Sequence, residues 1–383
     1  MKSNNNQKFI PVAEPAFVGN EMKYVQDCIR SGWISSIGEY IKRFEESFAE
    51  YCGVRHAIAC CNGTAALHLS MLALGIDSED EVILPTLTYI ATANAVTYCG
   101  GRPVLIDSEP ATWTMDCSLI ERKISKRTKA IIAVHLFGHP ADMGALRKLA
   151  DKYGLYLVED AAEAHGAKYK DRLVGSLSDV AIYSFYGNKI LTTGEGGMVV
   201  TDNGEIAESI RQLRGQGVDT QRRYWHPIIG YNYRMTNIAA AIGLAQLEKC
   251  QWHISRRREI HKQYEDYLAH VPGIEFQKEQ KWAENVYWMN ALTIDDTAKN
   301  AYPARRDLCI QRLCEAGVES RPFFYPMHQL PMYRSAAENQ RFPVAEDVAN
   351  RGICLPSSAL LKESDVRYVS TQLKSAIEEC RSE

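Results

Sequence analysis

Short β-rich segments alternate with helical segments through the middle of this chain, from about residue 71 to residue 202. The helical segments at 91–98 and 142–153 space their apolar residues as amphipathic helices do. Strands that alternate with helices form a mainly parallel sheet covered on both faces, so the sequence predicts an α/β fold. The expected strands are residues 81–85, 129–135, 156–160, 180–185 and 197–202.

A different pattern begins after about residue 250, where the alternation gives way to a long charged helical segment. We expect residues 1–250 to form a large domain that includes an N-terminal segment, and residues 251–383 to form a smaller α+β domain. The expected elements of the smaller domain are a helix over 253–268, a strand over 286–294 and helices near 305–316 and 364–378.

The composition is that of an ordinary globular protein. The 383 residues are 46% hydrophobic and carry a formal net charge of -3, with a pI near 6.4. This charge gives no reason to expect a nucleic acid or an anionic membrane as partner. The polar start MKSNNNQ has no signal-peptide core, and no run approaches the roughly 20 apolar residues of a membrane helix. We expect a soluble cytoplasmic protein with no membrane association.

The eleven cysteines are scattered and never form a C-x-x-C pair. In a cytoplasmic protein this pattern favours buried, reduced thiols over disulfides. The sequence therefore predicts no zinc site and no other metal site.

The segment Asn62-Gly63-Thr64-Ala65-Ala66 precedes a helical run. The first N–H groups of a helix have no partner within the helix, and small residues there allow a phosphate to approach them. Gly-Thr before a helix is also common as a simple cap, so the pattern alone leaves both interpretations open.

Asp160 and Glu159 end the apolar run YLVED. At least one carboxylate therefore lies at the carboxyl end of a strand, where ligands of parallel sheets bind. An Asp at this point could equally cap the next helix. A cationic heterocycle nearby would favour the functional role.

Lys189 lies in a turn between the run VAIYSF and the Gly- and Thr-rich segment TTGEGG. Lysines in turns are usually solvated. Here the aromatic and small neighbours predict a close-packed setting, which would remove water from the amine and lower its pKa. A lysine in such a setting is a nucleophile that can form a Schiff base.

Five motifs occur in order: NGTAAL, PTLTYIATANAV, VEDAAEAHGA, SFYGNKILTTGEGGM and GYNYRMTNIAAAIGLAQLE. Together they resemble the sugar aminotransferases of the DegT/StrS-type family, and the likeness extends from about residue 11 to residue 356. The resemblance implies the aspartate aminotransferase fold (fold type I) and pyridoxal 5′-phosphate (PLP) as the cofactor.

The resemblance also implies how the cofactor is held. Gly63, Thr64 and Ala65 would provide the backbone seat for its phosphate, joined by the Ser184 hydroxyl. Tyr89 would stack on the face of the pyridine ring.

Three further residues would act on the cofactor chemically. Asp160 would pair with the pyridinium nitrogen and keep it protonated. Lys189 would form the internal Schiff base and then move a proton during transamination. Glu163 stands where many relatives have Gln, which donates a hydrogen bond to the phenolate oxygen. A carboxyl group can donate there only when protonated.

Asn232 could simply satisfy a turn between two tyrosines. In similar enzymes this residue crosses a dimer interface to the neighbour's cofactor phosphate. The resemblance therefore implies a homodimer whose active sites are shared.

Segments outside these motifs, at 31–36, 223–226 and 321–333, resemble one branch of the family. Its members aminate C4 of GDP-4-keto-6-deoxymannose with glutamate as donor, and their products enter bacterial surface polysaccharides such as O-antigen lipopolysaccharide. Without the resemblance, a packed aromatic or a satisfied histidine is the commoner role for such residues. The candidate substrate contacts are Trp33, His226, Tyr325 and His328.

Three alternatives compete with this interpretation. The substrate could be a UDP- or dTDP-linked 4-keto-6-deoxyhexose, which only substrate tests distinguish. A related branch of sugar dehydratases replaces the cofactor lysine by histidine, and Lys189 argues against it. A non-catalytic, PLP-binding regulator would carry an added DNA-binding segment or would lack the lysine and the acid. Both Asp160 and Lys189 are present.

Overall fold

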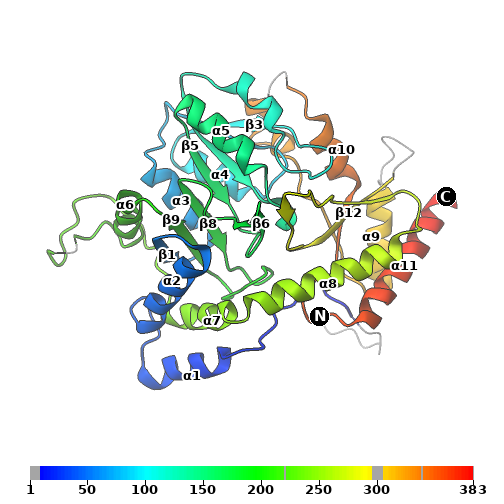
Figure 1. Ribbon diagram of the computed structural model, residues 1–383, viewed down its shortest axis with the longest axis horizontal. Helices are drawn as coiled ribbons and strands as arrows, with labels where there is room; N and C mark the ends of the chain where they lie inside the picture. Colours follow the sequence, from blue (N-terminus) through cyan, green and yellow to red (C-terminus); the bar gives the residue numbers. More distant parts are fainter. Residues whose placement is uncertain (1–8, 220, 296–304, 338–339, 383) are drawn as a thin grey trace.

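A seven-stranded sheet forms the centre of the computed structural model, which describes residues 9–219, 221–295, 305–337 and 340–382 (Figure 1). Five neighbouring strands run parallel, and β9 is antiparallel to both of its neighbours. The predicted mainly parallel α/β fold is confirmed. In order across the sheet the strands are β1 (His56–Cys60), β9 (Gly197–Thr201), β8 (Val180–Ser184), β5 (Tyr156–Asp160), β4 (Thr128–Val134), β2 (Glu81–Pro85) and β3 (Arg102–Ile106).

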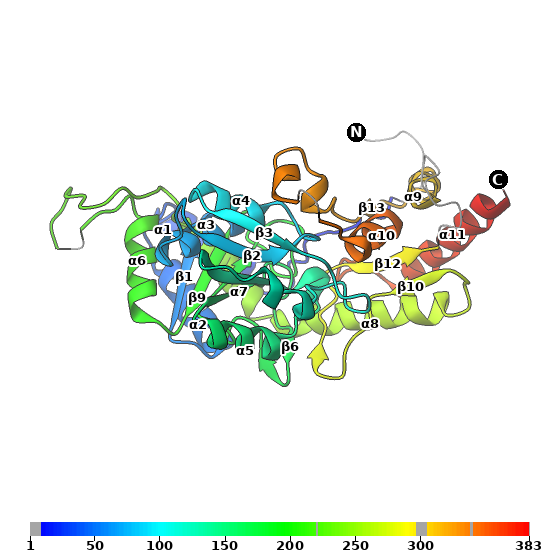
Figure 2. The ribbon, with the colours of Figure 1, turned by 90° about the horizontal axis from the view of Figure 1, so that it is seen from above.

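Helices cover both faces of this sheet, as its wholly buried central strands require. Figure 2 shows α3 and α4 on one face and α2 and α5 on the other. Polar caps start several of these helices; the side chain of Asp142, for example, accepts the N–H of Ala145. The helices packed around the sheet are α1 (Glu21–Ser31), α2 (Glu39–Cys52), α3 (Gly63–Ala73), α4 (Ala91–Tyr98), α5 (Met143–Tyr153), α6 (Gly204–Arg214) and α7 (Asn237–Leu247).

A smaller antiparallel sheet follows in the chain, with its own apolar core formed against three helices. Its strands, in order, are β10 (Ile274–Phe276), β12 (Asn290–Ile294), β14 (Gly352–Leu355) and β13 (Arg321–Pro322). The helices of this region are α8 (Cys250–Leu268), α9 (Arg305–Glu315), α10 (Pro343–Arg351) and α11 (Glu363–Ser382).

Two features of this region differ from the sequence-based expectation. The strand expected over 286–294 begins only at Asn290, because Tyr287 has a φ of 48° and its backbone cannot continue a strand. The N-terminal segment packs against the smaller sheet: Ile10 bridges to Val318, and the N–H of Val12 donates to Glu319 at 3.0 Å. The division of the chain at residue 250 stays a prediction.

Short elements complete the fold. A three-stranded sheet consists of β11 (Ala283–Glu284), β6 (Lys168–Tyr169) and β7 (Arg172–Leu173). Single 3-10 turns lie at Cys117–Leu119, Glu121–Lys123, Leu136–Gly138, Met327–Gln329 and Arg334–Ala337. Most cysteines are buried, as expected, whereas Cys314 is exposed. Within the described part of the chain, no helix has both the length and the apolar character needed to cross a membrane.

The topology brings chain segments that are distant in sequence to one edge of the large sheet. Because β1 and β8 are both antiparallel to β9, β1 runs in the same direction as the parallel strands. The carboxyl ends of β1, β2, β5 and β8 therefore meet at one edge, where ligands of such sheets bind.

Candidate functional site

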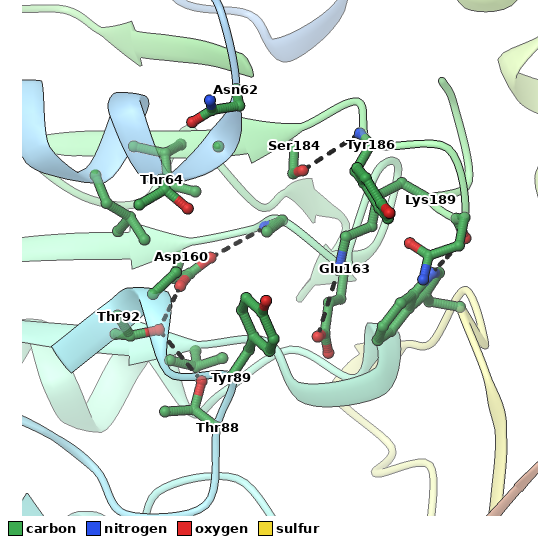
Figure 3. A pocket seen from close by; sticks show the side chains of 18 of the residues that line it. Asn62, Thr64, Thr88, Tyr89, Thr92, Asp160, Glu163, Ser184, Tyr186 and Lys189 are labelled. Atoms are coloured by element: carbon green, nitrogen blue, oxygen red, sulfur yellow. Dashed lines mark hydrogen bonds and ion pairs between the residues drawn. The ribbon is translucent and has the colours of Figure 1, made fainter. Parts of the chain in front are cut away.

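A cavity of about 790 Å³ opens at this edge of the sheet (Figure 3). Its walls include residues from α3, α4 and the ends of β5 and β8, together with residues of the smaller sheet. Eight of the nine residues predicted to contact the cofactor line it: Gly63, Thr64, Ala65, Tyr89, Asp160, Glu163, Ser184 and Lys189.

The amino end of α3 lies against the end of β8. Asn62 caps the helix by accepting the N–H of Ala65 at 2.8 Å. The N–H groups of Gly63 and Thr64 start the helix and have no partner within it. A Cβ atom on Gly63 would lie 2.8 Å from Cβ of Ser184, so glycine allows this close approach. Two N–H groups and a hydroxyl group therefore lie together, an arrangement that suits a phosphate.

Asp160 ends β5 and is buried in the cavity wall. Its Oδ2 accepts the hydroxyl of Thr92 at 2.7 Å, and its Oδ1 accepts the N–H of Ala162 at 3.2 Å. No helix follows Asp160 in this part of the chain, so the capping interpretation is wrong. Burial raises the pKa of the Asp160 carboxyl, and the bonds from Thr92 and Ala162 oppose the rise. A cationic ring nitrogen would supply the missing counter-charge.

Lys189 lies in the turn after β8, and only 12% of its side chain is exposed. Its Nζ lies 3.7 Å from Oε1 of Glu163 and 3.7 Å from the centre of the Trp288 ring. The indole N–H of Trp288 donates to the carbonyl of Asn188 at 2.8 Å, which fixes the ring beside the lysine. Burial lowers the pKa of the Lys189 amine, and Glu163 opposes this change. The amine therefore has the setting of a nucleophile.

Glu163 points toward Lys189 from the segment after β5. Its Oε2 accepts the N–H of Phe137 at 2.8 Å, and Phe137 adopts a left-handed backbone with φ 57°. Burial raises the pKa of the Glu163 carboxyl to about 7, against the opposing effect of Lys189. Near neutral pH the group can therefore hold a proton and donate it in a hydrogen bond.

Tyr89 lies at the cavity wall with 56% of its surface exposed. Its ring centre is 5.6 Å from that of Phe324, which comes from the segment after β13. An exposed aromatic face beside the cavity can stack on a flat ligand.

These groups fit PLP. The α3 amino end and Ser184 suit its phosphate, Asp160 suits its ring nitrogen, Tyr89 suits its ring face and Lys189 suits its aldehyde carbon. The fit rests on residues that the fold brings together from four separate segments.

The other predicted site residues do not line this cavity. Asn232 is exposed and pairs with Gly215 at the base of a long loop. His226 belongs to that loop, where its Nδ1 lies 2.9 Å from the carbonyl of Gln216. Figures 1 and 2 both show the loop between α6 and α7 projecting away from the body. Neither Asn232 nor His226 lines the cavity of its own chain, although Tyr233, the neighbour of Asn232, does.

The remaining candidate substrate contacts also lie outside the cavity lining. Trp33 and Tyr325 are 57% and 67% exposed. His328 has both ring nitrogens engaged, at 2.8 Å from Oγ1 of Thr86 and 3.1 Å from Oε1 of Glu346. The substrate role of all three stays a prediction.

The structure adds residues to the cavity wall that the sequence analysis did not single out. Thr88 and Thr92 belong to a quoted motif, and their spacing of four residues was the available signal. Trp288 and Arg321 come from the smaller sheet region. Trp288 lies in the run that predicted a strand and Arg321 begins the segment 321–333, but neither pattern points to a place in the cavity wall. Arg321 is the one guanidinium among the described residues that line the cavity. In the described ranges, no cluster of three or more His, Cys, Asp or Glu side chains could hold a metal ion.

Comparison with known proteins identifies close relatives. Residues 15–374 match the model of the DegT/DnrJ/EryC1/StrS aminotransferase family. The chain is 48% identical to the GDP-perosamine synthase of Caulobacter vibrioides over 366 residues, which cover 95% of this chain and 97% of that protein. It is also 48% identical to the GDP-perosamine synthase of Escherichia coli O157:H7, with 94% and 97% covered.

The fold has close solved counterparts. A Streptococcus pneumoniae protein solved in its PLP form superposes with a TM-score of 0.91 at 27% identity. The match covers 97% of this chain and 100% of that chain, so both parts of the fold are shared.

Proposed function

The chain belongs to the DegT/DnrJ/EryC1/StrS aminotransferase family, and from this we propose that it transfers an amino group from glutamate to C4 of GDP-4-keto-6-deoxymannose, giving GDP-perosamine. It is a PLP-dependent aminotransferase of nucleotide keto sugars. One observation carries the choice of sugar: the chain is 48% identical over almost its full length to two GDP-perosamine synthases.

When bound, PLP supplies an electron sink that makes the proton on the carbon next to the amino group removable. We propose that the free N–H groups of Gly63 and Thr64, with the neighbouring Ala65 and the Ser184 hydroxyl, hold its phosphate. Tyr89 covers the ring. The close approach of α3 to Ser184 at the end of β8, which a Cβ atom on Gly63 would prevent, supports this seat.

Asp160 and Lys189 take the chemical roles in this proposal. Asp160 would pair with the ring nitrogen of bound PLP and would keep it protonated, because a buried carboxylate favours a cationic partner. Lys189 would hold the cofactor through its amine and, when that amine is free, would be the base that moves a proton of the amino donor. The lowered pKa of the buried Lys189 amine supports the second role.

Glu163 occupies the position of a hydrogen-bond donor in this site. We propose that its protonated carboxyl group donates to the phenolate oxygen of the cofactor. The raised pKa of about 7 supports a protonated carboxyl at neutral pH, and the bond from Phe137 fixes its direction.

We propose glutamate as the donor because Arg321 lines the cavity and a guanidinium is suited to a donor that carries carboxylates. The guanidinium of Arg321 pairs with Glu319 at 2.9 Å, a carboxylate that the donor would replace or share. Trp33, Tyr325, His226 and His328 remain candidate contacts for the nucleotide sugar.

A homodimer with shared active sites explains why some predicted site residues lie away from the cavity of their own chain. We propose that the loop between α6 and α7 reaches the neighbouring cavity and that Asn232 binds the neighbour's cofactor phosphate. The projection of this loop away from the body supports the proposal (Figure 1). We further propose that the enzyme works in the cytoplasm and supplies an amino sugar for O-antigen lipopolysaccharide.

A two-step absorbance experiment tests the proposed function. Glutamate should bleach the yellow colour of the PLP-loaded protein, and after its removal GDP-4-keto-6-deoxymannose alone among GDP-, UDP- and dTDP-linked keto sugars should restore the colour. Recovery with a UDP- or dTDP-linked sugar instead would overturn the choice of substrate but keep the aminotransferase. Failure of glutamate to bleach the wild-type protein would reject glutamate as donor.

A further inference from the structure

A chain of hydroxyl groups connects Thr88 and Thr92 to the buried carboxylate of Asp160. Oγ1 of Thr92 lies 2.7 Å from Oδ2 of Asp160 and 3.2 Å from Oγ1 of Thr88. Figure 3 shows the three side chains in a row along one side of the cavity. Thr88 and Thr92 are each only 1% exposed, so water does not compete for these bonds.

The acceptor at the end of this chain of hydroxyl groups determines which group donates in each hydrogen bond. An ionised carboxylate only accepts hydrogen bonds, so Thr92 must donate its one hydroxyl proton to Asp160. Thr92 then has no proton left for Thr88, and Thr88 must be the donor in the second bond. Both hydroxyl groups therefore point their protons toward Asp160 while it is ionised.

The second oxygen of Asp160 is also hydrogen-bonded, because its Oδ1 accepts the backbone N–H of Ala162. Burial raises the pKa of the carboxyl, and the bond from Thr92 comes first among the interactions that oppose the rise. Lys189 and His135 act in the same direction as Thr92. Of the two hydrogen bonds that Asp160 accepts, the bond from Thr92 is the shorter, at 2.7 Å against 3.2 Å, so its hydroxyl group is the nearest donor that favours the carboxylate.

We propose that Thr92, oriented by Thr88, is a positioning residue that keeps Asp160 ionised and turned toward the ring nitrogen of the bound cofactor. The inference rests on the proposed function in its assignment of PLP to this cavity. If the hydroxyl of Thr92 is removed, the proton shared between Asp160 and the ring nitrogen should move toward Asp160. The ring then loses positive charge and becomes a weaker electron sink.

Three variants isolate the hydroxyl group of Thr92. Thr92→Val removes it and keeps the shape of the side chain, whereas Thr92→Ser keeps the hydroxyl and removes a methyl group. Thr97→Val is the matched control. Thr97 lies on the same helix and does not line the cavity, and its Oγ1 bonds to the carbonyl of Ala93 at 3.1 Å and to the hydroxyl of Tyr333 at 3.2 Å.

Two readouts report on the ring nitrogen and on catalysis. The proteins are loaded with PLP labelled with ¹⁵N in the ring, and the ¹⁵N resonance reports whether that nitrogen is protonated. The rate of bleaching by glutamate is measured on the same samples. Thr92→Val should shift the resonance toward neutral pyridine and slow bleaching by about tenfold, the loss expected for one hydrogen bond to a charged group. Thr92→Ser and Thr97→Val should stay within about twofold of wild type.

Two results would overturn the proposal: a Thr92→Val resonance identical to that of Thr97→Val, or a Thr92→Ser protein as impaired as Thr92→Val. If Thr92→Val fails to bind the cofactor, Thr88→Val takes its place and should shift the resonance in the same direction by a smaller amount. An unchanged resonance in Thr88→Val would then reject the proposed role of the hydroxyl groups of Thr88 and Thr92. Because the resonance needs only bound PLP, it tests Thr92 even if glutamate is the wrong donor.

Discussion

At the residue scale, Glu163 brings a carboxyl group next to the reactive lysine. Whether this carboxyl group is protonated determines whether it can donate a hydrogen bond. Burial raises its pKa from 4.5 to about 7. Because the folded-state value is the higher one, its contribution to stability is complete below about pH 4.5 and is lost as the pH rises through about 7. A glutamine at this position would have no such pH dependence.

We therefore expect Glu163→Gln to make the cofactor-free protein more stable than wild type at about pH 8, by on the order of 1–3 kcal/mol. The difference should shrink as the pH falls toward about 5. Chemical denaturation at several pH values measures it, with Glu79→Gln at an exposed position as control. A difference that stays constant with pH would mean that Glu163 is ionised throughout.

Lys189 is the residue on which turnover depends most. Lys189→Ala should lower the rate of the glutamate half-reaction by more than about a thousandfold, because the amine that anchors the cofactor and moves the proton is lost. Circular dichroism should show an unchanged fold. The exposed Lys281→Ala is the control for loss of a lysine. Substantial turnover by Lys189→Ala would show that another group is the anchor.

At the element scale, the amino end of α3 and the end of β8 form the proposed phosphate seat only because Gly63 has no side chain. Gly63→Ala places a Cβ atom 2.8 Å from Cβ of Ser184, so the helix must move away from the strand. We expect PLP affinity to fall by about tenfold or more, since several phosphate contacts lengthen together.

Gly204 provides a matched control for this substitution. Like Gly63 it is the first residue of a helix capped by Asn, but the nearest atom to an added Cβ is Nε2 of His56 at 3.8 Å. Gly204→Ala should leave PLP affinity unchanged in equilibrium dialysis. Equal losses in the two variants would mean that the effect comes from helix-start conformation rather than from contact with Ser184.

The helices and strands differ in how far the sequence could predict them. The strand expected over 156–160 matches β5, and the helix expected over 91–98 matches α4, because apolar runs and helical spacing mark buried elements directly. The sequence does not predict β3, which begins with Arg102 and Pro103, or the two-residue β13, because neither shows a clear apolar alternation.

At the scale of the whole molecule, the cavity joins the large sheet to the smaller sheet region, and this explains which site residues could be predicted. Asp160 ends a strand, Lys189 follows one, and both belong to recognisable motifs. Trp288 and Arg321 reach the cavity only through the packing of the smaller sheet region, about 100 residues or more after Lys189. Sequence periodicity describes local structure and does not report such long-range contacts.

The proposed dimer predicts complementation between two inactive variants. If each site combines Lys189 of one chain with Asn232 of the other, a mixed dimer of Lys189→Ala and Asn232→Ala contains one intact site and one doubly damaged site. Equal mixing with exchange of subunits should therefore give about a quarter of wild-type activity. Activity no higher than the average of the two separate variants would place Asn232 and Lys189 in the same chain's site or in no common site.

The most direct test of the central claim follows the transferred atom. The PLP-loaded enzyme is incubated with ¹⁵N-glutamate and GDP-4-keto-6-deoxymannose, and the nucleotide sugars and keto acids are analysed by mass spectrometry. We predict one ¹⁵N-labelled GDP-4-amino-4,6-dideoxy sugar and one 2-oxoglutarate per turnover, with neither product formed by Lys189→Ala. If glutamate is consumed and no ¹⁵N appears in any nucleotide sugar, the enzyme does not aminate this substrate and the proposed function is wrong.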